Sequence, residues 1–179
     1  MTETLHPSRR LTPFVDGRRI LSGDDATLAA RLPAMTSEAG PPALVIDDAT
    51  GRPTDVKPAA EPAPRPGRGR PKLGVVPREV TLLPRHWDWL ATQPGGASVA
   101  LRKLVEEARR ASRPADRQRQ ARDAAYHAMS TLAGDFPGFE EASRALFADD
   151  RPLFAARIAD WPADIVTYLT GLLDRDGED

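Results

Sequence analysis

Short alternating runs of apolar and polar residues fill the first third of the chain, which is typical of small strands and turns. The runs Thr12–Val15 and Arg19–Leu21 flank an Asp16-Gly17 pair. An Asp-Gly pair between two short apolar runs predicts a tight β-hairpin. Two aspartates then precede Ala26–Leu32, whose apolar spacing predicts a short helix with an acidic first turn.

A second pair of short apolar runs follows this helix. Ala43–Ile46 is typical of a buried strand, Thr50-Gly51 of a turn, and Thr54–Val56 of a returning strand. The pattern therefore predicts a small ββαββ domain over residues 10–57. We expect its core to consist of Phe14, Val15, Ile20, Leu21, Leu28, Leu32, Leu44, Val45 and Ile46.

In the last third of the chain, apolar residues recur at spacings of three and four, which is the period of amphipathic helices. Gly134, Pro137, Pro152 and Pro162 separate the periodic segments. The pattern predicts an acidic, all-helical C-terminal domain over residues 113–179. Its helices are expected at Ala115–Leu132, Gly138–Ala148, Arg151–Ala159 and Ala163–Leu173.

Between these blocks, residues 75–112 combine one strand with two helices. Val75-Val76 and Glu79–Leu83 read as a single strand interrupted at Pro77. Pro84 suits the first position of a helix, which is expected over Arg85–Gln93. Trp87 and Leu90 share one face of that helix, so we expect both to be buried.

A Pro-Gly-Gly sequence ends the first helix, and Ser98 can cap a second one running to about Ala111. One face of this second helix is apolar and the opposite face is basic. The apolar stripe consists of Leu101, Leu104, Val105 and Ala108, and the outer face carries Arg102, Lys103, Arg109 and Arg110.

Charge is distributed unevenly along the chain. Residues 1–60 carry 7 Lys/Arg and 8 Asp/Glu, residues 61–123 carry 14 and 7, and residues 124–179 carry 4 and 11. The net charges of these three segments are therefore −1, +7 and −7. A basic middle suggests a polyanionic partner, although attraction between the middle and the acidic C-terminal segment also explains it. The two explanations are compatible.

Residues 58–74 are too rich in proline and glycine for regular structure, so we expect an extended tether. An Arg-Gly-Arg-Pro sequence is narrow enough to lie in the minor groove of A·T-rich DNA, which attracts arginine. This strip resembles an AT-hook. The matching residues are Arg68, Gly69, Arg70, Pro71 and Lys72. The alternative is a basic linker that serves solubility alone.

The order strand, helix, glycine turn, helix over residues 75–112 resembles the ribbon–helix–helix fold. In that fold two chains pair their single strands into an antiparallel ribbon that enters the major groove. The resemblance implies a homodimer. It also implies that Arg78 and Thr81 approach base edges, and that Arg85 and the amides of Ala97 and Ser98 contact phosphates.

The sequence leaves open which set of alternate side chains of the predicted strand points inward. If Val80 and Leu82 point inward, the side chains of residues 79 and 81 face outward. If Thr81 and Leu83 point inward, the ribbon offers Arg78 at its edge and mostly apolar groups elsewhere.

The wider sequence resembles a bacterial family known as domain of unknown function number 2239. The resemblance rests on GRGRPKLGVVPREVTLLPRHWDWLATQPGGASVALRKLVEEAR and on the flanking VIDDATGR and GFEEASRALFADD blocks. It implies a bacterial source and supplies no activity.

Catalytic chemistry has little support in the sequence. Cysteine is absent, which excludes disulfides and thiolate chemistry and fits a reducing compartment. His6, His86 and His127 lie in three different blocks, without the spacing of a metal site. We therefore expect no enzyme, no metal and no cofactor. With no apolar leader or membrane-length apolar run, we expect a cytoplasmic protein.

Together these features predict an α+β protein that binds DNA, as a transcriptional regulator or a nucleoid-associated protein. The alternative is a non-catalytic interaction and dimerisation module whose basic strip binds an acidic partner or RNA. The aromatic residues of the C-terminal helices offer a further protein-binding surface if several of them are exposed.

Overall fold

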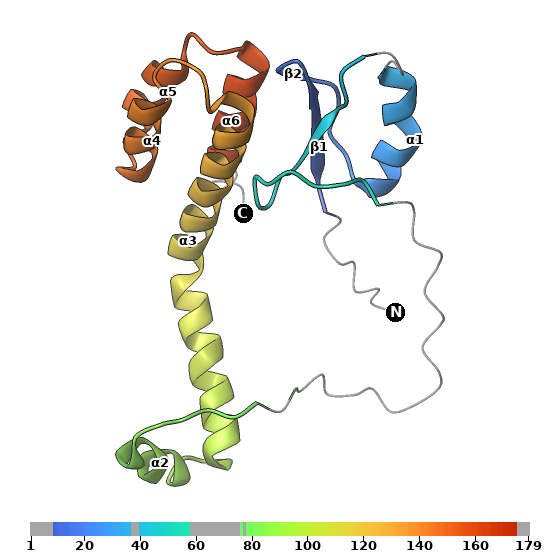
Figure 1. Cartoon of the computed structure of the whole chain (residues 1–179). Coiled ribbons are helices and arrows are strands. Elements are labelled where there is room, and N and C mark those ends of the chain that lie inside the picture. Colours follow the sequence, from blue (N-terminus) through green and yellow to red (C-terminus); the bar gives the residue numbers. More distant parts are fainter. Residues whose placement is uncertain (1–8, 37–39, 58–75, 77, 175–179) are drawn as a thin grey trace. The chain divides into compact units, whose positions relative to one another are not determined.

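The computed structural model of the chain describes residues 9–36, 40–57, 76 and 78–174. These residues form six helices and one three-stranded antiparallel sheet, so the protein is a mostly helical member of the expected α+β class. The chain divides into two compact units, and Figure 1 shows the helices and strands in chain order. Unit 1 comprises residues 1–61 and 115–179, and unit 2 comprises residues 62–114.

The sheet of unit 1 has the strand order β2-β1-β3. Its strands are β1 (Leu11–Val15), β2 (Arg18–Arg19) and β3 (Leu44–Asp47). The β1–β2 hairpin confirms the Asp-Gly prediction: Asp16 and Gly17 both have positive φ, at 48° and 74°. Two successive residues with positive φ give a turn whose twist matches that of the flanking strands.

Helix α1 (Asp25–Met35) packs on one face of this sheet, where Leu28 is buried with Leu11 and Val45. Asp24 caps the helix, since its Oδ1 accepts a hydrogen bond from the Thr27 amide at 2.8 Å. Hydrogen bonds from the Thr27 side chain and amide hold the pKa of Asp24 below its ordinary value. The acidic helix start predicted from the sequence is therefore confirmed.

The predicted fourth strand at residues 54–56 is wrong. The Asp47 amide donates to the Arg52 carbonyl at 2.9 Å and the Thr54 amide donates to the Val45 carbonyl at 2.9 Å, but no named strand results. Pro53, which forms an isolated bridge with Ile46, has no N–H group with which to extend the ladder. The N-terminal segment is therefore ββαβ rather than ββαββ.

The expected core of this segment is confirmed only in part. Phe14, Leu28, Val45 and Ile46 are buried, whereas Leu44 is 37% exposed at the start of β3. The other residues expected there are partly buried: Val15, Ile20, Leu21 and Leu32.

The C-terminal helices follow the sequence prediction closely. They are α4 (Phe139–Phe147), α5 (Arg151–Ile158) and α6 (Ala163–Asp174). They share one core with the sheet, because Phe14 and Ile46 belong to the same buried cluster as Phe154, Ile165 and Tyr168. The sequence pattern treated the N-terminal and C-terminal segments as separate blocks, yet the fold combines them in unit 1.

Close contacts join the sheet and the loop after β3 to the helices of unit 1. The Tyr168 hydroxyl donates to the Asp48 carboxylate at 2.9 Å in a buried position, and the Tyr168 ring packs edge-on against Phe14. The loop after β3 approaches the backbone of α3 so closely that a Cβ on Gly51 would lie 1.8 Å from the Ala124 carbonyl oxygen. Gly51 also has a φ of +67°, so both space and conformation require glycine.

Helix α3 runs without interruption from Gly96 to Ala133, with Pro114 inside it. The expected boundary between two helices near residue 113 is therefore wrong. A proline removes one backbone hydrogen bond but keeps a helical φ, so a long helix can continue through it. No helix in the described part of the chain has the length and apolar character to cross a bilayer.

Candidate nucleic-acid interface

Unit 2 contains α2 (Pro84–Ala91), the segment that precedes it and the first half of α3. Pro84 occupies the first turn of α2, as the sequence predicts. The segment before α2 is not a strand: residues 76 and 78–83 form no strand pairing. A strand requires a partner for its backbone hydrogen bonds, and no described segment of unit 2 supplies one. The strand expected at 75–83 is therefore absent from its described residues, 76 and 78–83.

The turn between α2 and α3 is built by two glycines. Gly95 and Gly96 have φ values of +85° and +77°, and α3 begins directly at Gly96. The prediction that Ser98 caps the second helix is therefore wrong, because Ser98 already lies inside the first turn. The amides of Ala97 and Ser98 nonetheless belong to the turn whose N–H groups have no partner within the helix.

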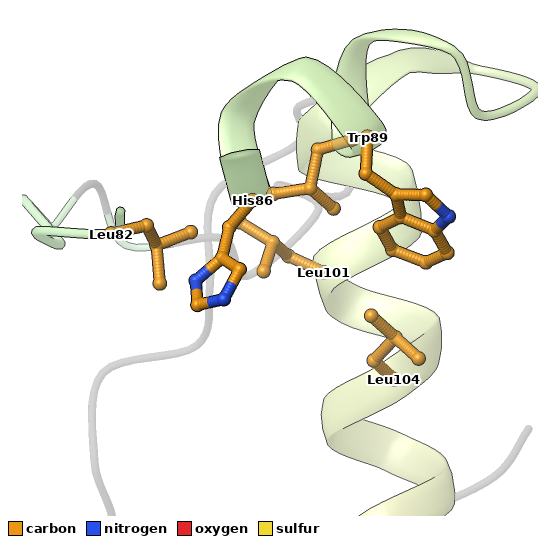
Figure 2. A pocket seen from close by; sticks show the side chains of 6 residues that line it. Leu82, His86, Trp89, Leu101 and Leu104 are labelled. Carbon is orange, nitrogen blue, oxygen red and sulfur yellow. The ribbon is translucent and has the colours of Figure 1, made fainter. Parts of the chain in front are cut away.

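A small apolar pocket lies between α2 and the first turns of α3 (Figure 2). Its volume is about 260 Å³. It is lined by Leu82, His86, Trp89, Leu90, Leu101 and Leu104. In Figure 2, His86 and Trp89 come from α2 and Leu101 and Leu104 from α3, with Leu82 on the preceding segment. His86 is the one polar residue of this lining, and it is exposed.

The apolar side chains of unit 2 are mostly exposed. Among the large apolar residues described in this unit only Leu90 is buried, at 2% exposure. Trp87, which the sequence pattern assigns to the core, is 40% exposed, and Val105 of the predicted apolar stripe is 63% exposed. The strongly exposed set consists of Val76, Val80, Leu83, Trp87, Trp89, Leu104 and Val105. We call these seven residues the exposed apolar set.

The residues expected at the major groove and at phosphates fall on neighbouring elements of unit 2. Arg78, Thr81 and Arg85 are exposed, on the segment before α2 and in its first turn. Ala97 and Ser98 lie in the first turn of α3. No hydrogen bond or ion pair within the described ranges joins the two groups.

The AT-hook-like residues Arg68, Gly69, Arg70, Pro71 and Lys72 lie outside the described residues. The basic residues of the first half of α3 are described, and all are exposed. They are Arg102, Lys103, Arg109, Arg110 and Arg113. Sequence reasoning placed the first four on the outer face of a helix ending at Ala111. It missed Arg113, because the helix was expected to end before Pro114.

Within the described ranges, no group of three or more His, Cys, Asp and Glu side chains is arranged to hold a metal ion. Of the expected order strand, helix, glycine turn and helix, the described residues of unit 2 contain α2, the Gly95-Gly96 turn and α3, without the strand.

The model of the family described as "Uncharacterized protein conserved in bacteria (DUF2239)" matches residues 55–173. The chain belongs to this family. The DUF2239 match contains all of unit 2 and nearly all of the C-terminal helices, whereas the three strands and α1 precede it. No curated protein and no solved structure matches the chain.

Proposed function

We propose that this chain binds DNA as a homodimer assembled through unit 2, as a transcriptional regulator or a nucleoid-associated protein of the bacterial cytoplasm. The observation that carries the proposal is the exposed apolar set on a unit of strongly positive charge. Unit 2 has 11 Lys/Arg and 4 Asp/Glu, a net charge of +7, whereas the rest of the chain has 14 and 22, a net charge of −8.

The dimer follows from the exposed apolar set. A unit whose described residues bury a single large apolar side chain gains little hydrophobic free energy from them. Pairing of the 78–83 segments of two copies would satisfy backbone groups that have no strand partner within the described part of the chain. It would also bring the exposed apolar residues of two copies together. One symmetric contact thus accounts for both features.

DNA is favoured as the partner by charge and by geometry. Every described Lys and Arg of unit 2 is exposed, beginning with Arg78 and Arg85. In the proposed complex, Arg68, Arg70 and Lys72 lie in an A·T-rich minor groove. The side chains of residues 78 and 81 approach base edges, while Arg85 and the helix-start amides at 97 and 98 contact phosphates.

The test is fluorescence anisotropy of the full chain with an A·T-rich and a G·C-rich duplex across a salt series. We expect the logarithm of the association constant to fall steeply with the logarithm of salt, by about 0.9 for each phosphate contact. Arg68→Ala/Arg70→Ala is expected to abolish the preference for A·T, and Arg78→Ala to weaken binding to both duplexes.

The matched control is Arg144→Ala/Arg157→Ala, which removes two exposed arginines from the C-terminal helices of unit 1. This control has the same loss of charge and is expected to bind like the wild type. Absence of binding at low salt contradicts the proposal.

The exposed apolar set alone also favours a second function, a protein-interaction module whose basic strip binds an acidic protein or RNA. Phe147 and Leu153 extend this possibility to the C-terminal helices, since both are strongly exposed there. Pull-down of a protein partner that needs Trp87 and Trp89, together with no affinity for a duplex, is the result that favours this second function.

A further inference from the structure

The outer face of the first half of α3 carries a row of arginines. Arg102, Arg109 and Arg113 are separated by seven and four residues, so at 100° per residue their directions differ by about 20° to 40°. At a rise of 1.5 Å per residue, they are spaced by about 10.5 Å and 6 Å along the helix axis. All three are exposed.

This row lies away from the apolar stripe of the same helix. By the same helical geometry, Leu101, Leu104 and Ala108 project roughly 100° to 160° away from the centre of the arginine row, and Val105 projects about 60° away from it. A dimer contact centred on Leu101, Leu104 and Ala108 therefore leaves the arginine row open to solvent and to a ligand, with Val105 at the edge of the contact nearest the row.

One carboxylate interrupts the row. Glu106 lies between Arg102 and Arg109 on the helix, and its Oε1 is 3.4 Å from Arg109 Nη2 and 3.6 Å from Arg110 Nε. The two arginine side chains are 65% and 73% exposed and the glutamate 44%. Such solvent-exposed pairs are weak, so a phosphate group can replace the glutamate as the partner of Arg109. Arg113 makes no ion pair with any described residue.

We infer that Arg102, Arg109 and Arg113 form a second contact with DNA, in which they bind phosphates of the duplex backbone, and that Glu106 weakens this contact. The inference rests on the proposed function and adds to it. The ribbon–helix–helix resemblance assigns phosphate contact to the start of α3, whereas this row extends the contact over three further turns. The contact carries no base specificity, because arginines on a phosphate backbone read charge and spacing only.

The experiment measures binding of the full chain to a fluorescent duplex across a salt series, for the wild type and four variants. Arg109→Ala/Arg113→Ala is expected to lower the salt slope by about 1.8, which is the loss of two phosphate contacts. Glu106→Gln is expected to raise affinity several-fold at low salt. Its control, Glu107→Gln, makes the same change in net charge on a different face and is expected to raise affinity much less.

The fourth variant is Arg144→Ala/Arg157→Ala, the control for the double arginine change, and helix content is checked by circular dichroism. If the wild type binds but the double variant keeps its full slope and Glu106→Gln equals Glu107→Gln, the inference is overturned while the proposed function stands. If the wild type does not bind a duplex, both are overturned. A different outcome is that the chain binds a single-stranded RNA more tightly than a duplex of the same length, with a salt slope that again depends on Arg109 and Arg113. That result overturns DNA as the ligand of the arginine row.

Discussion

Unit 1 buries large apolar side chains in two clusters, the larger of which is shared by the sheet and the helices, whereas unit 2 leaves seven of its own exposed. Their charges also differ, with −8 in unit 1 and +7 in unit 2. A unit that satisfies its own apolar and polar groups needs no partner to fold. This contrast is the basis of the proposal that unit 2 is the part of the chain that binds a second copy and DNA.

The largest effect is expected from Gly51→Ala in unit 1. The added Cβ would lie 1.8 Å from the Ala124 carbonyl oxygen, on a residue whose φ is +67°. We expect the free energy of unfolding of unit 1 to fall by about 4 kcal/mol or more. In a Trp87→Phe/Trp89→Phe background, urea titration followed by the fluorescence of Trp161 reports on unit 1 alone.

The control for this change is Gly171→Ala in α6, where an added Cβ meets nothing within 4 Å. Alanine is the better helix former, so this variant is expected to be as stable as the wild type or up to about 1 kcal/mol more stable. Equal stability of the Gly51 and Gly171 variants would contradict the close approach of the loop to α3.

Core truncation compares the two units directly. Phe154→Ala removes a ring that is 1% exposed in unit 1 and is expected to lower the free energy of unfolding by about 3–5 kcal/mol.

Leu104→Ala removes a side chain that is 43% exposed in the single chain. If unit 2 dimerises, this leucine is buried at the contact, and we expect a loss of about 2 kcal/mol that grows as the protein is diluted. A concentration-independent change below about 0.5 kcal/mol would show that Leu104 stays in solvent.

Tyr168→Phe tests the polar contact that joins the β3 loop to α6. The change removes the hydroxyl that donates to Asp48 in a buried position and keeps the ring against Phe14. We expect unit 1 to lose about 1–3 kcal/mol, again measured through Trp161. A variant as stable as the wild type would mean that the hydrogen bond contributes nothing net.

The smallest effect concerns the pH dependence of α1. Because the pKa of Asp24 is lowered in the folded state, its cap stabilises the helix above the ordinary value of 3.8. That contribution is lost as the pH falls through the lowered folded value. Amide hydrogen exchange in α1 is therefore expected to accelerate in acid. The substitution Asp24→Asn keeps a capping side chain that does not titrate, so that variant is expected to lack this component.

Much of unit 1 follows from local sequence patterns. The hairpin is set by Asp16-Gly17, and the C-terminal helices by a period of 3.6 residues between glycines and prolines. The shared core is not local, since Phe14 packs against Tyr168 from the other end of the chain. Spacing alone contains no signal for such a contact. The fourth strand failed for a local reason, the missing N–H of Pro53.

Unit 2 was less predictable, because residues whose spacing is typical of a core lie exposed in it. Trp87 and Val105 look like core residues by spacing, yet both are exposed in the single chain. Ser98 is a residue type that often caps helices. However, α3 already begins at Gly96, after a turn in which Gly95 and Gly96 have positive φ. The exposure of Arg78 and Arg85 was predictable, because charged side chains are seldom buried.

The most direct test of the account is the mass of the full chain in solution, measured by sedimentation velocity over a range of concentrations. The account predicts a species of twice 19.5 kDa that reverts to the monomer in Val105→Asp. Gln120→Asp, an exposed position of α3 in unit 1, is expected to leave the dimer intact. A monomer at every concentration, with α2 and α3 still helical, would contradict the claim that unit 2 is completed by a second copy.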